Sequence, residues 1–188
     1  GDVIGKNVAG IGAINNGVDL LIDAASVTGG DLGIRAANTG TGTLSITASG
    51  DVIGKNVAGI NTKNAGTDLL INVAKVTGGN VGITATNDGT GALSITSSGS
   101  VIGFTNAGID AESAGVGGAG ATNASGNSLD GVSLAINAGN VTGGTYGIYA
   151  YNSGSGALII TASDAVTGNA DDGIFAYNAS AEDTTITI

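Results

Sequence analysis

The sequence contains no proline, cysteine, methionine, tryptophan or histidine among its 188 residues. Without cysteine the chain cannot form a disulfide or a thiol nucleophile, and without cysteine and histidine it lacks the usual zinc ligands. Charged residues make up only 11% of the chain, and the formal net charge is -10. This shortage of lysine and arginine argues against a nucleic-acid partner, because binding phosphates requires positive charge.

Long hydrophobic runs are missing as well. No uninterrupted apolar stretch approaches the roughly 20 residues that a membrane-spanning helix needs, so we expect no membrane insertion by this segment. The mean hydropathy is nevertheless positive, at +0.32, which indicates a chain that folds. Glycine is abundant, with 36 residues, and each glycine inside a helix costs about 1 kcal/mol relative to alanine. The composition therefore predicts strands and turns.

Internal repeats dominate the sequence. Residues 1–49 and 50–98 align without a gap and are identical at 34 of 49 positions. A shorter half-repeat begins with V-T-G or V-I-G at Val3, Val27, Val52, Val76, Val101, Val141 and Val166. The spacings between these starts are 24, 25, 24, 25, 40 and 25 residues. The long fifth interval equals one 24-residue unit plus an insertion of 16 residues, around residues 116–131.

Three features recur in every half-repeat. An isoleucine follows a glycine at Ile11, Ile34, Ile60, Ile83, Ile109, Ile148 and Ile174. A polar residue lies four positions later, at Asn15, Asn38, Asn64, Asn87, Ser113, Asn152 and Asn178. An apolar pair with one residue between its members comes next, at Leu20 and Ile22, Leu44 and Ile46, Leu69 and Ile71, Leu93 and Ile95, Leu134 and Ile136, Leu158 and Ile160, and Ile186 and Ile188. Apolar residues that alternate with variable ones over such short segments are typical of strands.

These features predict an all-β fold, a right-handed parallel β-helix (solenoid) of about seven coils of 24–25 residues with three short strands each. Equivalent residues of successive coils then stack about 4.8 Å apart, so valine, isoleucine and leucine columns fill a narrow interior. The insertion around residues 116–131 is expected to be a surface loop that can be deleted at little cost to stability. We expect residues 1–188 to be a single solenoid segment of a longer repeat protein, or a subunit that stacks end to end.

The polar column from Asn15 to Asn178, which we call the asparagine ladder, is expected at a corner of each coil. There the side chains bond backbone groups of the turn and of the neighbouring coils, and asparagine tolerates a positive φ. This column is interpreted as structural.

The V-T-G-G, G-I-x-A-x-N and G-T-G-x-L-S-I-T elements, together with the lack of cysteine, resemble the passenger regions of bacterial autotransporters and related surface adhesins. The resemblance covers the whole chain. It implies a right-handed β-helix displayed outside a Gram-negative cell. It also implies a partner on a host or neighbouring cell, either a receptor or a glycan.

Acidic and aromatic residues concentrate in the second half of the chain. Residues 1–75 carry five bases and six acids, whereas residues 76–188 carry nine acids and no base. In the G-I-x-x-x-N/S strand the isoleucine and the second residue after it point inward. The first and the third residues after the isoleucine therefore face solvent. In the last three coils these outward positions hold Asp110, Glu112, Tyr149, Tyr151, Phe175 and Tyr177, which we call the acidic-aromatic face.

Two interpretations of this face stay open. The rings and carboxylates form a platform for a receptor or a sugar, or the rings only stabilise the sheet by stacking across strands. Asp110 and Glu112 also suit the carboxylate spacing of an inverting glycosidase. The absence of histidine, of a nearby base and of a water-excluding site argues against an enzyme, and we expect no cofactor and no metal. The predicted function is an extracellular stalk or adhesin segment of a bacterial surface protein, and the alternative is a carbohydrate-binding or carbohydrate-cleaving β-helix.

Overall fold

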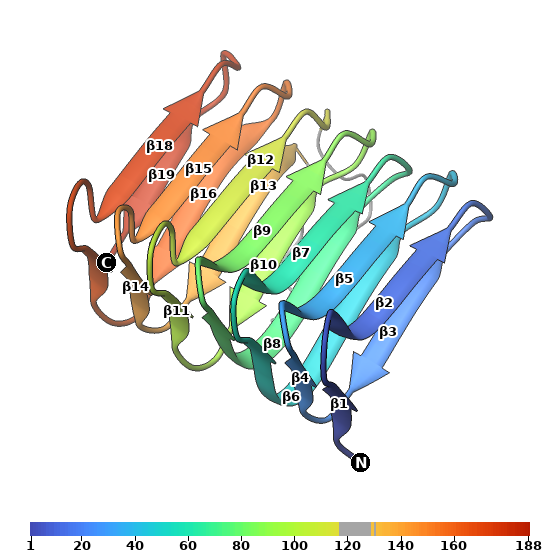
Figure 1. The fold of residues 1–188 in the computed structure, drawn as a ribbon. Coiled ribbons are helices and arrows are strands. Elements are labelled where there is room, and N and C mark those ends of the chain that lie inside the picture. The colour runs from blue at the N-terminus through green and yellow to red at the C-terminus, as the bar shows by residue number, and fades with distance from the viewer. Residues whose placement is uncertain (117–128, 130) are drawn as a thin grey trace.

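A computed structural model describes residues 1–116, 129 and 131–188 of the chain. This part consists of strands and turns that wind as a right-handed β-solenoid of about seven coils (Figure 1). The two ends of the chain lie at opposite ends of the rod. The predicted all-β class and parallel β-helix are therefore confirmed. Within the described residues, no helix is long and apolar enough to cross a membrane.

Each coil contributes to three parallel ladders. The first ladder contains β1 (Val3–Gly5), β4 (Val27–Gly29), β11 (Val101–Gly103), β14 (Val141–Gly143) and β17 (Val166–Gly168). The second contains β2 (Ala9–Asn15), β5 (Leu32–Asn38), β7 (Ala58–Asn64), β9 (Val81–Asn87), β12 (Ile109–Ser113), β15 (Ile148–Asn152) and β18 (Ile174–Asn178). The third contains β3 (Leu20–Ala24), β10 (Leu93–Ser97), β13 (Val132–Ala138), β16 (Ala157–Ala162) and β19 (Thr184–Thr187).

Two longer strands join the ladders. β6 (Leu44–Gly54) and β8 (Leu69–Gly78) each run from the third ladder of one coil into the first ladder of the next. The first and third ladders consequently form one 12-stranded sheet, and the second ladder forms a separate 7-stranded sheet. The expected three strands per coil are present, but in these two places the strand assignment continues through the corner between coils, with a register irregularity between Ala48 and Asp51 in β6.

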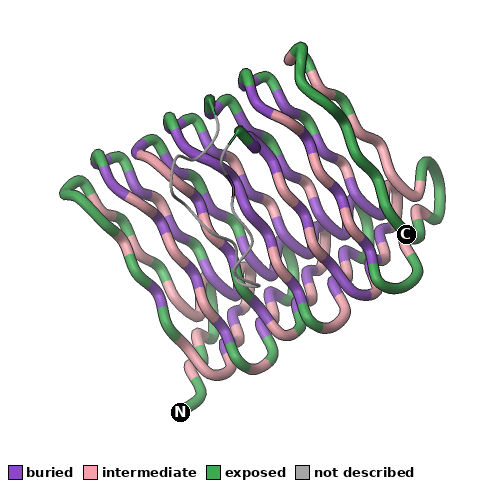
Figure 2. Tube along the Cα trace, turned by 180° about the vertical axis from the view of Figure 1, so that it is seen from behind, coloured by how far each residue is buried: buried purple, intermediate pink, exposed green. Residues whose placement is uncertain are grey.

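The register places equivalent residues opposite one another. Ile83 pairs with Ile60 on one side and Ile109 on the other, and all three side chains are fully buried. The predicted isoleucine column is therefore confirmed. Central coils bury their inward residues completely, whereas the first and last coils are covered on one side only and stay partly exposed (Figure 2).

One sequence assignment in the last coil was wrong. Ile186 was expected to continue the leucine column, but Thr184 lies opposite Leu158 and Ile186 lies opposite Ile160. The turn that begins at Asn178 sets this register. Its side chain bonds the backbone of the same turn as the other ladder asparagines do, so the next strand begins at the same offset.

Close backbone approach explains the glycines of the corners. A Cβ on Gly29 would lie 1.6 Å from the carbonyl oxygen of Leu32, so no other residue fits the tight corner after the first strand. A Cβ on Gly59 would lie 2.3 Å from a methyl group of Val76 in the next coil. Glycine is needed there because the valine fills the space that a side chain would occupy.

The backbone corrects one expected reason for the asparagine ladder. No described residue other than glycine has a positive φ, and among the described glycines only Gly131 does, with a φ of 72°. Tolerance of the left-handed region therefore does not explain the asparagines. Their hydrogen bonds do, as shown below.

The predicted surface loop around residues 116–131 falls mostly outside the described residues, since 117–128 and 130 are not among them. Leu129 near its end is described and is 2% exposed. This leucine packs over the outer side of the third ladder, among Leu70, Ala92, Val132, Ala135 and Ile159. Deleting the whole insertion would thus remove a buried side chain, and burying a leucine is worth about 1.5–3 kcal/mol. We no longer expect that deletion to be without cost.

Candidate functional site

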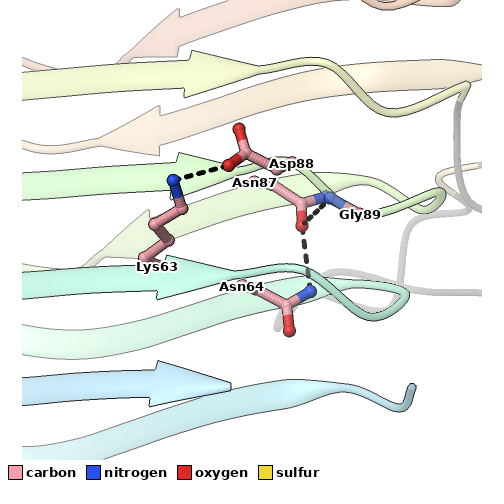
Figure 3. Close-up of polar contacts among 5 residues, drawn as sticks. All are labelled: Lys63, Asn64, Asn87, Asp88 and Gly89. Carbon is pink, nitrogen blue, oxygen red and sulfur yellow. Dashed lines mark hydrogen bonds and ion pairs between the residues drawn. The ribbon is translucent and has the colours of Figure 1, made fainter. Parts of the chain in front are cut away.

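The asparagine ladder ties neighbouring coils together. The amide nitrogen of Asn64 donates to the side-chain oxygen of Asn87 at 2.9 Å (Figure 3). Asn38 in the previous coil donates to Asn64 in the same way, also at 2.9 Å. Each amide oxygen also accepts the backbone N–H two residues later, as Asn87 does from Gly89. The second amide hydrogen goes to a carbonyl of the same turn, such as that of Gly91 for Asn87. At Asn64 the amide nitrogen and the amide oxygen are both fully used inside a buried corner.

The ladder is interrupted where the insertion enters. At Ser113 the hydroxyl donates to the carbonyl of Ser133 at 2.9 Å, and Ser133 in turn donates to Gly115 and accepts from Gly156, both at 2.7 Å. The side chain of Asn152 resumes the column by donating to Asn178 at 2.7 Å. The structural role predicted for the ladder is supported by these bonds. The fifth coil replaces an amide contact with a pair of serines.

The fold brings the predicted acidic-aromatic face together on the 7-stranded sheet. Strand β12 lies between β9 and β15, and β15 lies between β12 and β18. The register pairs Asp110 with Tyr149 and Glu112 with Tyr151. It also pairs Tyr149 with Phe175 and Tyr151 with Tyr177. All six residues therefore form two neighbouring outward columns over three coils.

The rings of this face stack on one another. Tyr149 and Phe175 have ring centroids 4.8 Å apart with planes 8° from parallel, and Tyr151 and Tyr177 are 4.9 Å apart at 11°. Both spacings match the distance between adjacent strands, so the ring planes stand across the rod axis. Ring edges and hydroxyls point outward, while the stacked faces are used within each pair. This arrangement fits cross-strand stabilisation better than a flat sugar platform.

A cleft of about 180 Å³ opens beside the stack. Its lining consists of Asn106, Ala107, Asp110, Glu112, Tyr146 and Tyr149. The rings of Tyr146 and Tyr149 are 5.5 Å apart and inclined at 58°. The cleft exists because the small Ala107 and the short Asp110 of one coil adjoin two tyrosines of the next.

The surroundings of the cleft disfavour the negatively charged forms of its own side chains. Burial raises the pKa of the Asp110 carboxyl, and the nearby charge of Glu112 raises it further. The pKa of the Tyr146 hydroxyl is raised chiefly by a hydrogen bond to Asp171 and by the charge of that carboxylate. Negative charge thus surrounds the cleft on two sides.

A basic side chain reaches toward this surface from the third coil. The ammonium of Lys63 lies 2.7 Å from the carboxylate of Asp88, and both side chains are exposed (Figure 3). The hydrogen bond and charge of Asp88 raise the pKa of Lys63, and Glu112 adds a smaller contribution. Such exposed pairs contribute little to stability. Lys63 is held by Asp88, so it does not neutralise the cleft.

Comparison of the chain with family models, with curated proteins and with solved structures found no match. The assignment of function therefore depends on the sequence pattern and on the geometry of this face. Among the described residues, no group of three or more carboxylates is arranged to hold a metal ion.

Sequence reasoning missed three residues of the cleft, Asn106, Ala107 and Tyr146. Tyr146 and Asn106 lie in the corners before β15 and β12, outside the strand alternation that was used to select outward positions. A signal was available for Tyr146, because it occupies the position directly before the G-I pair, which Ala107 fills in the previous coil. The change from alanine to tyrosine in that column marks the wall of the cleft.

Proposed function

We propose that this chain is an extracellular stalk or adhesin segment of a bacterial surface protein of the autotransporter-passenger type. In this proposal the repeated coils form a rod, and the acidic-aromatic face on the last three coils presents a binding surface to a receptor or glycan on a host or neighbouring cell. End-to-end association of segments would lengthen the rod.

The unequal surface of the second ladder is the observation that carries this proposal. The strands of this ladder keep one register from β2 to β18, with an isoleucine column throughout and an asparagine column that is broken only by Ser113 in β12. The outward positions differ, being threonine at Thr84 and Thr86 in β9 but tyrosine at Tyr149 and Tyr151 in β15. A role limited to solubility does not require large apolar rings at exposed positions.

The rod itself supports the stalk part of the proposal. The continuous core and the amide ladder connect each coil to its neighbours, so tension along the axis is distributed over columns of contacts. The alternative, a carbohydrate-binding or carbohydrate-cleaving β-helix, has less support. One face of each ring is covered by its stacked partner, so the rings do not lie flat on the surface as a sugar platform, and the paired carboxylates lie on the surface of one strand. Glycan arrays and an assay of reducing-sugar release discriminate this alternative.

Attachment of coated beads tests the proposal. Beads carrying the chain through its N-terminus are scored for attachment to host-cell monolayers and to bacterial cells. We expect a Tyr149→Ala, Tyr151→Ala double variant to lose most attachment, because aromatic anchors dominate binding energy at interfaces. The matched control is Thr84→Ala, Thr86→Ala, which changes the same two strand positions two coils away and keeps attachment.

A second variant separates binding from folding. Tyr151→Phe, Tyr177→Phe keeps both stacked rings and removes only the outward hydroxyls, so its stability should equal that of the parent.

Attachment that is unchanged in the double alanine variant would leave the chain as an inert spacer. No attachment by the parent chain to any cell would remove the adhesive part of the proposal.

A further inference from the structure

The cleft beside Tyr149 has a shape and charge that the stacked rings do not explain. Tyr149 stacks on Phe175 with one face, so its other face points toward β12 and the cleft. Tyr146 inclines toward the same space from the preceding corner. Two aromatic walls and two carboxylates, Asp110 and Glu112, thus meet around one small volume.

The size of the cleft limits its occupant. Pockets that bury drug-sized ligands measure roughly 300–1,000 Å³, whereas this cleft holds about 180 Å³. One compact headgroup fits, but several sugar units do not. The face of an aromatic ring carries negative potential and attracts a cation, and an ammonium group held against two tyrosines is a frequent recognition mode.

The charges favour a cation over a neutral or anionic group. No lysine or arginine follows Lys75 in the sequence, and Lys63 is engaged by Asp88. Asp110 is partly desolvated and close to Glu112, an arrangement that costs free energy until a positive charge enters. The carboxylate of Asp171, which raises the pKa of the Tyr146 hydroxyl, adds a further negative charge near that ring.

We propose that this cleft binds one organic cation, an alkylammonium or quaternary ammonium group, which lies against the inclined rings of Tyr146 and Tyr149 and next to the carboxylates of Asp110 and Glu112. This inference rests on the proposed function, because it names the ligand class that the acidic-aromatic face recognises. The cation is either a lysine side chain of a partner protein or a choline-type headgroup, and both end in a positively charged ammonium group.

Small-molecule titration of the ¹⁵N-labelled full chain tests this inference without cells. The probes are choline, Nα-acetyl-lysine amide, and 3,3-dimethylbutan-1-ol, which has the shape of choline without its charge. We expect choline or the lysine derivative to shift the amide signals of β12 and β15 saturably, and the neutral alcohol to cause no saturable shift. The stronger of the two cations identifies the source.

Two variants and a control locate the site. Asp110→Asn and Tyr146→Leu should each weaken cation binding about tenfold or more, since both remove a direct contact in the cleft. Asp164→Asn removes one exposed carboxylate after β16, changes the net charge equally and should leave the affinity within twofold. Circular dichroism verifies that the variants fold.

The inference is overturned if choline and the lysine derivative fail to bind, if the neutral alcohol or a neutral sugar binds as well as the cations, or if Asp164→Asn weakens binding as much as Asp110→Asn. Cation binding and bead attachment are independent readouts. If the chain attaches to cells but binds no cation, the proposed function stands and this inference is wrong. If the chain binds cations but never attaches, the cation site stands and the proposed function is wrong.

Discussion

Replacing Asn64 with alanine tests the asparagine ladder at a fully buried position. The amide of Asn64 donates to Asn87 at 2.9 Å and to two carbonyls of its own turn at 3.0 and 3.1 Å, and it accepts from Asn38 at 2.9 Å. Each net hydrogen bond contributes about 1 kcal/mol, and partners left unpaired in a buried corner add to the loss. We expect Asn64→Ala to lower the free energy of unfolding by about 3 kcal/mol, measured by urea denaturation followed by circular dichroism.

The same change at the end of the rod is the matched control. Asn15 belongs to the same column but is half exposed, and it makes one ladder bond, to Asn38, and one bond from the backbone of Gly17. Water replaces these contacts readily, so Asn15→Ala should cost about 1 kcal/mol or less. Equal losses at the two positions would refute the ladder as a source of stability.

An isosteric variant tests the direction of the bonds. Asn64→Asp keeps the shape but replaces a donor with an acceptor that faces the side-chain oxygen of Asn87. At neutral pH it also buries a charge in the corner. We therefore expect Asn64→Asp to be less stable than Asn64→Ala at pH 7 and to recover part of the loss at acid pH. A fully tolerated aspartate would show that shape rather than hydrogen bonding maintains the corner.

Three further changes test the core and the cleft. Ile83→Ala should cost about 2–5 kcal/mol, whereas the outward neighbour Thr84→Ala should change unfolding little, and equal effects would overturn the inside-outside assignment. Thr62 is buried in the alanine column, and its hydroxyl has no hydrogen-bond partner among the described residues, so Thr62→Val should stabilise by about 1 kcal/mol in the same assay. Burial, reinforced by the charge of Glu112, raises the pKa of the Asp110 carboxyl above its ordinary 3.8. The folded state therefore favours the protonated carboxyl. This contribution to the free energy of unfolding is complete below pH 3.8 and is lost as the pH rises through the raised pKa. Asp110→Asn should accordingly raise the melting temperature at pH 7 but not near pH 3, and a gain that is independent of pH would contradict this cause.

The sequence alone was sufficient to determine the solenoid, the number of coils and the inward columns. A repeat of 24–25 residues places the same residue type at the same point of every coil, so Ile60, Ile83 and Ile109 had to stack once the strands were parallel. The outward columns follow from the same alternation, which is why the sequence alone predicts Asp110 and Tyr149 on one face.

The tertiary structure decided what depends on distances between coils. Stacking of Tyr149 on Phe175 requires the spacing and tilt of adjacent strands, and only these show that one face of each ring is covered by its partner. The cleft arises where the small Ala107 of one coil meets Tyr146 of the next, in a corner that has no strand periodicity to read. The reason for the glycines and asparagines also came from the coordinates, because close backbone contacts and shared amide bonds, rather than positive φ, select these residues at the corners.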